Sequence, residues 1–217
     1  MSTISCCSHC QEAGDFFNDK TARKELKRYR KKGPWKSTRQ LLSFMRLFTV
    51  KGKTLLDVGG GVGAIQHELF KEGLGKAIQV EASQAYIEAA EGEAERNGNK
   101  EKVESYFGDF VERAPELPEA DMVTMDRVLC CYPHPEELID AAASTCKTCC
   151  GVVYPRERWF IKPLAWLGNW MMRLKKKEFR IYIHSGDDIA AYFQKNGFHL
   201  TGTSRTFIWK VEMYSRS

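Results

Sequence analysis

The segment Thr54–Ala64 constrains the fold of this chain more than any other stretch. It begins with an apolar run, typical of a short buried strand, that contains Asp57 and ends at Val58. Glycines fill four of the five positions 59–63, and a helix is expected to follow over 64–70. A strand that turns through glycines into a helix brings bare backbone and a helix N-terminus close to a ligand. In parallel sheets that place is the crevice beyond the carboxyl end of the strand.

The spacing of these glycines fits two classes of ligand. Gly59-x-Gly61-x-x-Ala64 satisfies the fingerprint of dinucleotide-binding proteins. Asp57-x-Gly59-x-Gly61-x-Gly63 is equally the pattern of proteins that bind S-adenosylmethionine, which has no pyrophosphate. The loop alone therefore leaves both ligands open.

The composition indicates one folded domain with additions. A chain of 217 residues, 43% of them hydrophobic and 12% aromatic, can bury a full core. No apolar stretch reaches the ~18 residues of a membrane span. Because the N-terminal residues lack the basic and apolar regions of a secretion signal, we expect a cytoplasmic protein.

The eight cysteines fall into clusters, which in a cytosolic protein indicate thiols or a metal site before disulfides. Cys7-x-x-Cys10 and Cys146-x-x-Cys149 could together complete a four-thiolate zinc site. The second pair, however, falls where a helix is expected to end and a buried strand to begin, a common position for small apolar thiols. We therefore expect no metal.

The net charge of +5, from 33 basic and 28 acidic residues, sits largely in two basic runs, 24–32 and 173–177. Each run is typical of a solvated helix face. Each could also form a patch that meets nucleic acid, an anionic membrane surface or an acidic substrate.

Residues 1–50 are expected to form a helical cap or lid, with one helix over 18–32 and a second capped by Ser37. Strands and helices alternate from residue 51 to 217, which predicts a doubly wound, mostly parallel sheet. The expected strands are 54–58, 77–80, 103–107, 121–125 and 150–154, and a closing hairpin is expected from 199–206 and 207–214. Helices are expected after Ala64, Ser83, Pro135 and Ser185.

Two features later in the chain bear on the ligand. Glu81 ends the second expected strand, where a carboxylate can accept hydrogen bonds from both ribose hydroxyls that the two ligands share. Gly108-Asp109-Phe110 follows the third strand. An acid there can accept a hydrogen bond from an adenine amino group while the aromatic ring stacks on the base, which NAD binding does not require.

Together these motifs, with Asp126 at the end of the fourth strand, resemble class I S-adenosylmethionine-dependent methyltransferases over residues 54–155. The hairpin at 199–214 resembles the final antiparallel pair of that family. The resemblance implies a Rossmann-like, seven-stranded sheet with a reversed last strand, and S-adenosyl-L-methionine as cofactor. The residues that it assigns to the cofactor are Asp57, Gly59, Gly61, Gly63, Glu81, Gly108, Asp109, Phe110 and Asp126.

A narrower resemblance is to the magnesium-protoporphyrin O-methyltransferases. It is carried by segments similar in order and spacing, namely Phe16–Asn18, Tyr29, Leu129–Pro133 and Tyr182–His184. Those enzymes have an N-terminal helical lid with a tyrosine, and a histidine before the Tyr-Pro pair, where this chain has Cys131. The acceptor of this chain therefore stays open.

The segment after the fourth strand, 126–134, is expected to face the methyl group. Asp126 can hold the cofactor's amino group or pair with Arg127, and Tyr132 can orient a nucleophile or simply pack. His184 is the candidate base, because it follows the segment expected to roof the site. Tyr29 is a catalytic candidate only through the lid of the subgroup.

Residues 156–184 are expected to be irregular and are rich in aromatic side chains. They could belong to the core or form a lid over an apolar substrate. Alternatively, 163–177 could form an interfacial helix on a membrane surface, with Lys175–Lys177 at the lipid headgroups.

The sequence thus predicts a methyltransferase that acts on an oxygen or sulfur of a small, apolar acceptor. It lacks the Asn-Pro-Pro-Tyr and Asp-Pro-Pro-Tyr motifs, which disfavours methylation of the amino groups of bases. The alternatives are an RNA methyltransferase, a dehydrogenase that uses the glycine loop for NAD, and a non-catalytic module that binds metal or lipid. The oligomeric state stays open.

Overall fold

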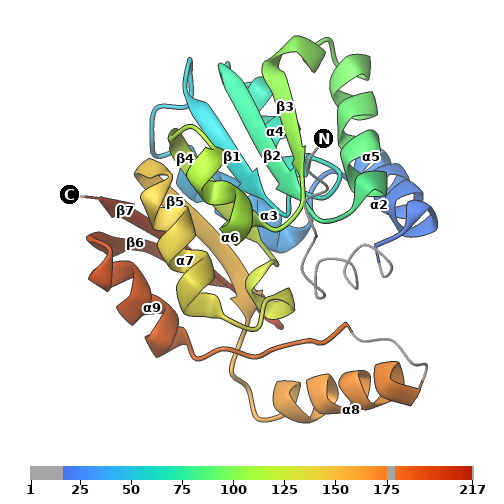
Figure 1. Cartoon of the computed structure of the whole chain (residues 1–217), viewed down its shortest axis with the longest axis vertical. Coiled ribbons are helices and arrows are strands. Elements are labelled where there is room, and N and C mark those ends of the chain that lie inside the picture. Colours follow the sequence, from blue (N-terminus) through green and yellow to red (C-terminus); the bar gives the residue numbers. More distant parts are fainter. Residues whose placement is uncertain (1–16, 175–178, 217) are drawn as a thin grey trace.

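The computed structural model describes residues 17–174 and 179–216. Its centre is a seven-stranded sheet with the strand order β3-β2-β1-β4-β5-β7-β6, in which β7 runs antiparallel to both of its neighbours (Figure 1). The predicted Rossmann-like fold with a reversed last strand is confirmed. The strands are β1 (Thr54–Val58), β2 (Lys76–Glu81), β3 (Val103–Phe107), β4 (Ala120–Asp126), β5 (Cys146–Pro155), β6 (Phe198–Arg205) and β7 (Trp209–Arg216).

Helices cover both faces of the sheet. They are α2 (Asp19–Lys32), α3 (Lys36–Met45), α4 (Ala64–Phe70), α5 (Gln84–Arg96), α6 (Phe110–Arg113), α7 (Pro135–Ser144), α8 (Ile161–Leu174) and α9 (Gly186–Lys195). The helices α6, α7 and α9 lie on one face, and α3 and α4 lie on the other (Figure 1). Neighbouring residues of β1 show the division, because Leu55 packs into the core under α3 and α4 while Leu56 packs into the opposite core.

The two N-terminal helices have different places. Asn18 caps α2 as expected, and α2 lies against α5. The helix α3 instead packs on the sheet, where Leu41 lies so close to Gly151 that a Cβ at that glycine would be 2.5 Å from Leu41 Cδ1. Ser37 does not cap α3, because the helix begins one residue earlier and buries Ser37 inside its first turn.

The expected irregular segment 156–184 contains the regular helix α8, which lies at one end of the molecule beside the chain that returns to α9 (Figure 1). Pro163 does not prevent the helix, because it sits in the first turn, where its missing N–H has no partner to lose. No helix within the described residues is both long and apolar enough to cross a membrane.

Candidate functional site

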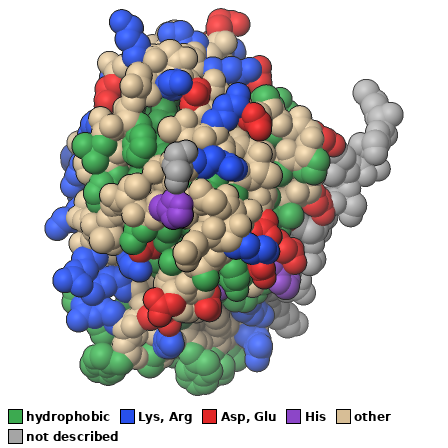
Figure 2. Space-filling view, turned by 90° about the vertical axis from the view of Figure 1, so that its left-hand side faces the viewer, with side chains coloured by type: hydrophobic (Ala, Val, Ile, Leu, Met, Phe, Trp, Pro, Cys, Tyr) green, Lys and Arg blue, Asp and Glu red, His purple; other side chains and the backbone are tan. Residues whose placement is uncertain are grey.

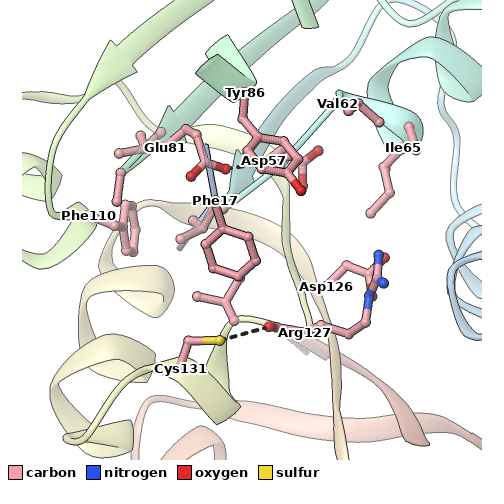
Figure 3. Close-up of a pocket in the computed structure, with 18 of the residues that line it drawn as sticks. Phe17, Asp57, Val62, Ile65, Glu81, Tyr86, Phe110, Asp126, Arg127 and Cys131 are labelled. Carbon is pink, nitrogen blue, oxygen red and sulfur yellow. Dashed lines mark hydrogen bonds and ion pairs between the residues drawn. The ribbon is translucent and has the colours of Figure 1, made fainter. Parts of the chain in front are cut away.

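A cavity of about 220 Å³ opens at the carboxyl ends of β1, β2 and β4, under α2 and the first turn of α5. Figure 3 shows Asp57 and Glu81 on one side of it, Arg127 and Cys131 on the other, and the ring of Phe17 between them. The cofactor residues that the sequence predicts and that line this cavity are Asp57, Gly59, Gly61, Glu81, Gly108, Asp109, Phe110 and Asp126.

The glycine loop needs glycine for two physical reasons. Gly59 has a φ of 58°, and a Cβ there would lie 2.6 Å from Cγ2 of Val128, so a side chain would be strained and would also clash. Gly63 does not line the cavity. It has a φ of 72° and occupies the position before the first residue of α4, so it directs the helix N-terminus towards the loop.

Asp57 is fully buried at the end of β1. Its Oδ1 accepts a hydrogen bond from the Thr124 hydroxyl (2.7 Å), whereas its Oδ2 has no partner within the described part of the chain. Burial raises the pKa of this carboxyl to about 7. A buried carboxylate oxygen that still needs a donor fits an ammonium group, which the cofactor's methionine moiety carries.

Glu81 lies at the end of β2 with 8% of its surface exposed. Its two oxygens accept hydrogen bonds from the backbone N–H groups of Gly61 (3.0 Å) and Ser83 (3.1 Å). Burial nevertheless raises the pKa of Glu81 to about 7. The carboxylate therefore ties the glycine loop to β2 and keeps lone pairs for further donors such as ribose hydroxyls.

Asp109 and Phe110 form the third wall. Asp109 Oδ1 caps α6 by accepting a hydrogen bond from the Val111 N–H (2.8 Å). The hydroxyl of Tyr132 donates to the same carboxylate, at 3.3 and 3.2 Å from its two oxygens. Tyr132 therefore contacts the expected adenine side of the site, and its possible role in orienting a nucleophile stays a prediction.

The end of β4 forms the opposite wall. The Thr38 hydroxyl donates to Asp126 Oδ2 (2.5 Å), and Arg127 Nε donates to Oδ1 (3.2 Å). Within the described residues, Arg127 is the one non-glycine residue with a positive φ, 65°. Its guanidinium also lies 3.8 Å from a carboxylate oxygen of Glu25. This strained turn holds a guanidinium at the cavity wall.

Aromatic side chains form the roof. Phe17 meets Tyr86 edge to face, with ring centroids 5.7 Å apart. The hydroxyl of Tyr86 donates to Glu25 (2.7 Å), and that of Tyr29 donates to Glu68 (2.9 Å). Burial, together with these carboxylate partners, raises the pKa of both tyrosines. Both phenols are therefore neutral at physiological pH.

His184 does not line the cavity. Its Nε2 lies 2.9 Å from the backbone oxygens of Leu129 and of Tyr132, so the imidazole holds the segment after β4 in place. Cys131 does line the cavity. Its hydrogen bond with Cys130 and its burial raise the pKa of the Cys131 thiol well above the usual range, so the thiol is protonated.

Sequence reasoning missed several residues of the cavity wall. Arg28 lies with its guanidinium 3.4 Å from the ring centroid of Trp35, and both residues line the cavity beside Glu25. The basic run 24–32 looks like a solvated helix face, so its sequence pattern could not reveal Arg28. The tryptophan directly after Gly33-Pro34 was the available signal, because a turn seldom needs so large a side chain.

The described residues contain no group of three or more side chains able to hold a metal ion. Cys146 and Cys149 are buried in β5, where burial raises the pKa of each thiol to about 12, and Cys146 Sγ donates to the Cys149 carbonyl oxygen (3.1 Å). Cys7 and Cys10, the other half of the possible zinc site, lie outside the described residues.

Solved structures share this fold. The magnesium protoporphyrin IX methyltransferase (ChlM) from Synechocystis PCC 6803, crystallised with bound SAH, superposes with a TM-score of 0.73 at 18% identity and covers 94% of this chain and 98% of its own. An O-methyltransferase family protein from Burkholderia thailandensis superposes with a TM-score of 0.70 at 15% identity, over 95% of this chain and 63% of its own.

Curated relatives match a shorter region. The ribosomal protein L11 methyltransferase of Klebsiella pneumoniae (strain 342) is 32% identical over 91 residues, which are 42% of this chain and 30% of that protein. The corresponding protein of Citrobacter koseri is 33% identical over the same length. The chain thus spans less than a third of the length of these relatives.

A family model described as "Methyltransferase domain" matches residues 26–202, most of the chain. That match covers the glycine loop, both acids at the ends of β1 and β2, and the cavity residues of β4, whereas Phe17 and Glu25 of the cavity wall precede it. The predicted class and cofactor are confirmed. The chain belongs to the methyltransferase domain family, as an S-adenosyl-L-methionine-dependent methyltransferase of class I.

Proposed function

We propose that this enzyme transfers the methyl group to an oxygen or sulfur of a small, apolar acceptor, and that the acceptor atom arrives already ionised. The observation that carries the proposal is the wall opposite Asp57 and Glu81. There the guanidinium groups of Arg28 and Arg127 lie among aromatic side chains.

The cofactor supplies a methyl group on a sulfonium sulfur, which is a good leaving group. Asp57 Oδ2 accepts from the ammonium group of the methionine moiety, which lies along the glycine loop. Glu81 accepts from the ribose hydroxyls, and Asp109 and Phe110 take the adenine. The other residues that we assign to cofactor binding are Gly59, Gly61, Gly63, Gly108 and Asp126.

The side chains on the acceptor side favour an acceptor from which no strong base has to remove a proton. The phenol of Tyr29 donates to Glu68, the thiol of Cys131 is protonated, and His184 lies at two carbonyl oxygens. A carboxylate, a thiolate or an acidic phenol needs no proton removed at neutral pH. The guanidiniums of Arg28 and Arg127 then hold the anion in line with the methyl group, and alignment supplies the catalysis.

The aromatic roof favours an apolar body for the acceptor, because Phe17, Trp35 and Tyr86 offer flat surfaces and few donors. RNA methylation remains a prediction without support here. Two basic residues of α2 have contacts within the chain, since Arg30 pairs with Glu93 (2.7 Å) and Arg28 lies on Trp35.

The test is an acceptor series on one scaffold, with release of S-adenosylhomocysteine as the readout. Naphthalene carrying a carboxylate, a thiol, a hydroxyl or an amine keeps the apolar body constant. We expect product from the carboxylate or the thiol and none from the amine. Product from the amine alone would contradict the proposal.

The matched variant is Arg127→Met, with Arg173→Met on the exposed surface of α8 as control. Loss of a hydrogen bond to a charged group costs about 1.5–3 kcal/mol, so kcat/KM for the best anion should fall about 10- to 150-fold. Cofactor affinity should stay unchanged, which separates acceptor binding from a collapsed site. An unchanged kcat/KM would remove the role of the guanidinium.

A further inference from the structure

The helix α8 presents its apolar side to solvent. Ile161 is its one buried residue among those described, whereas six of its other large apolar side chains are between 44% and 68% exposed. These are Leu164, Trp166, Leu167, Trp170, Met171 and Leu174. The polar side chain of Asn169 instead faces the protein, where it exchanges hydrogen bonds of 2.9 and 2.8 Å with the backbone of Ile181. This is the reverse of an ordinary surface helix and marks a binding surface.

The tip of the β6–β7 hairpin continues this surface. Phe207 is 69% exposed and stacks on Phe160, with ring centroids 5.2 Å apart, and Trp159 next to it is 85% exposed. Figure 2 shows hydrophobic side chains gathered at the lower end of the molecule, which is the end where Figure 1 places α8. The exposed aromatic side chains of α8 and of the hairpin tip therefore lie together at one end.

Arginines border the aromatic cluster. Arg156, Arg158 and Arg205 line a hollow beside the hairpin, together with Lys210 and the acids Glu157 and Asp187. The guanidinium of Arg158 lies 5.2 Å from the ring centroid of Phe160. Within the described chain, none of the three arginines forms an ion pair, although Lys162 pairs with Glu157. Desolvation lowers the pKa of Arg156, and the neighbouring guanidiniums of Arg158 and Arg205 lower it further.

We propose that this end of the molecule, formed by α8, Trp159, Phe160 and the hairpin tip, rests on the surface of an anionic phospholipid bilayer, with the three arginines at the lipid phosphates. Tryptophans next to arginines suit the boundary between headgroups and acyl chains. A second copy of this chain fits less well, because a two-fold contact through Phe207 would bring the unpaired arginines of both copies together.

The same end leads to the cavity. The segment that Asn169 holds continues to Tyr182, whose N–H donates to the Cys130 oxygen (2.8 Å), and Phe179 meets the cavity residue Phe17 edge to face at 5.7 Å. An apolar acceptor dissolved in the bilayer would thus be close to the site. The proposal that this surface binds a bilayer is independent of the acceptor proposed above.

The test is flotation of the full chain with vesicles of phosphatidylcholine, with and without phosphatidylglycerol, at low and high salt. We expect binding that needs phosphatidylglycerol and weakens with salt. Two double variants, Trp166→Ser with Trp170→Ser and Arg158→Glu with Arg205→Glu, should each reduce binding about tenfold or more.

The controls change exposed residues that do not belong to this surface. Leu47→Ser changes a leucine that is 78% exposed, and Lys147→Glu changes a lysine at the start of β5 that is 53% exposed. Both should bind as wild type, and every variant should keep its melting temperature and cofactor affinity. Wild-type protein that does not float with phosphatidylglycerol vesicles overturns the proposal, as do tryptophan variants that float like the controls. A dimer that these variants dissociate, without vesicle binding, overturns it in favour of self-association.

Discussion

The substitution Glu81→Gln separates what this carboxylate does for the cofactor from what it does for the fold. In the structure Glu81 accepts from the N–H groups of Gly61 and Ser83 and borders the cavity. The amide of glutamine keeps the shape of the carboxylate but loses its charge, and its NH2 group cannot accept a hydrogen bond. Loss of hydrogen bonds to a charged acceptor costs about 1.5–3 kcal/mol, so the Kd for S-adenosylhomocysteine should rise about 10- to 150-fold.

Because the pKa of Glu81 is raised, the experiment can also be made as a function of pH. The folded, cofactor-free protein keeps a proton on this carboxyl up to about pH 7, whereas the ordinary value is 4.5. Between these values the folded state binds more protons, so this group's contribution lowers the free energy of unfolding as pH rises. The cofactor needs the ionised form, so its affinity should rise with pH up to about 7 and then level off. In Glu81→Gln this rise should weaken, with Asp57 supplying the remainder.

Calorimetric titration with S-adenosylhomocysteine between pH 6 and pH 8, beside thermal melts of the free protein, measures both effects. The matched control is Glu104→Gln on β3, where the carboxylate is 47% exposed and pairs with Lys76. The control should bind within twofold of wild type. If Glu81→Gln binds as tightly as this control at pH 8, Glu81 does not hold the ribose. If it binds weakly only because its melting temperature has fallen, the carboxylate serves the fold.

Two further substitutions test the geometry of the site. Gly59→Ala combines a left-handed backbone with a Cβ 2.6 Å from Val128, so chemical denaturation should show a free energy of unfolding lower by about 1–2 kcal/mol or more. Gly92→Ala, in open space within α5, should instead raise the free energy of unfolding by about 0.5–1 kcal/mol. Equal unfolding free energies for the two variants would contradict the reasoning. Tyr132→Phe removes a hydrogen bond to Asp109, which should weaken the binding free energy of the cofactor by about 0.5–1.5 kcal/mol and so raise its Kd about 2- to 12-fold, with little change in kcat. A fall in kcat at unchanged Kd would instead favour the role as orienter of a nucleophile.

The cofactor side of the cavity could be predicted because each of its parts is local. A glycine loop, an acid at the end of β2 and the Asp109-Phe110 pair all follow directly from strand ends. Parallel strands bring those ends to one edge of the sheet, so three separate short motifs become one surface. The sequence pattern and the sheet topology were therefore sufficient to predict that these residues line one cavity.

The acceptor side depends on contacts between distant parts of the chain. Thr38 and Asp126 are separated by 88 positions, and no spacing rule joins them. Arg28 belongs to a run that looks like a solvated face until Trp35 folds beneath it. The contact of Tyr132 with Asp109 could not be predicted either, because Asp109 lies at another strand end, and its role in orienting a nucleophile stays a prediction. The segment that contains α8 was expected to be irregular, and a helix on a membrane surface was only one of its alternatives; the sequence does not show that the apolar residues of α8 face outward.

The place of β7 in the sheet has a consequence for how the protein is made. This strand comes after all the others along the chain, yet it lies between β5 and β6. While the polypeptide is being synthesised, β5 presents a row of unpaired N–H and C=O groups until the last hairpin emerges. Such an edge is a template for pairing with a neighbouring nascent molecule, and insertion of β7 removes it.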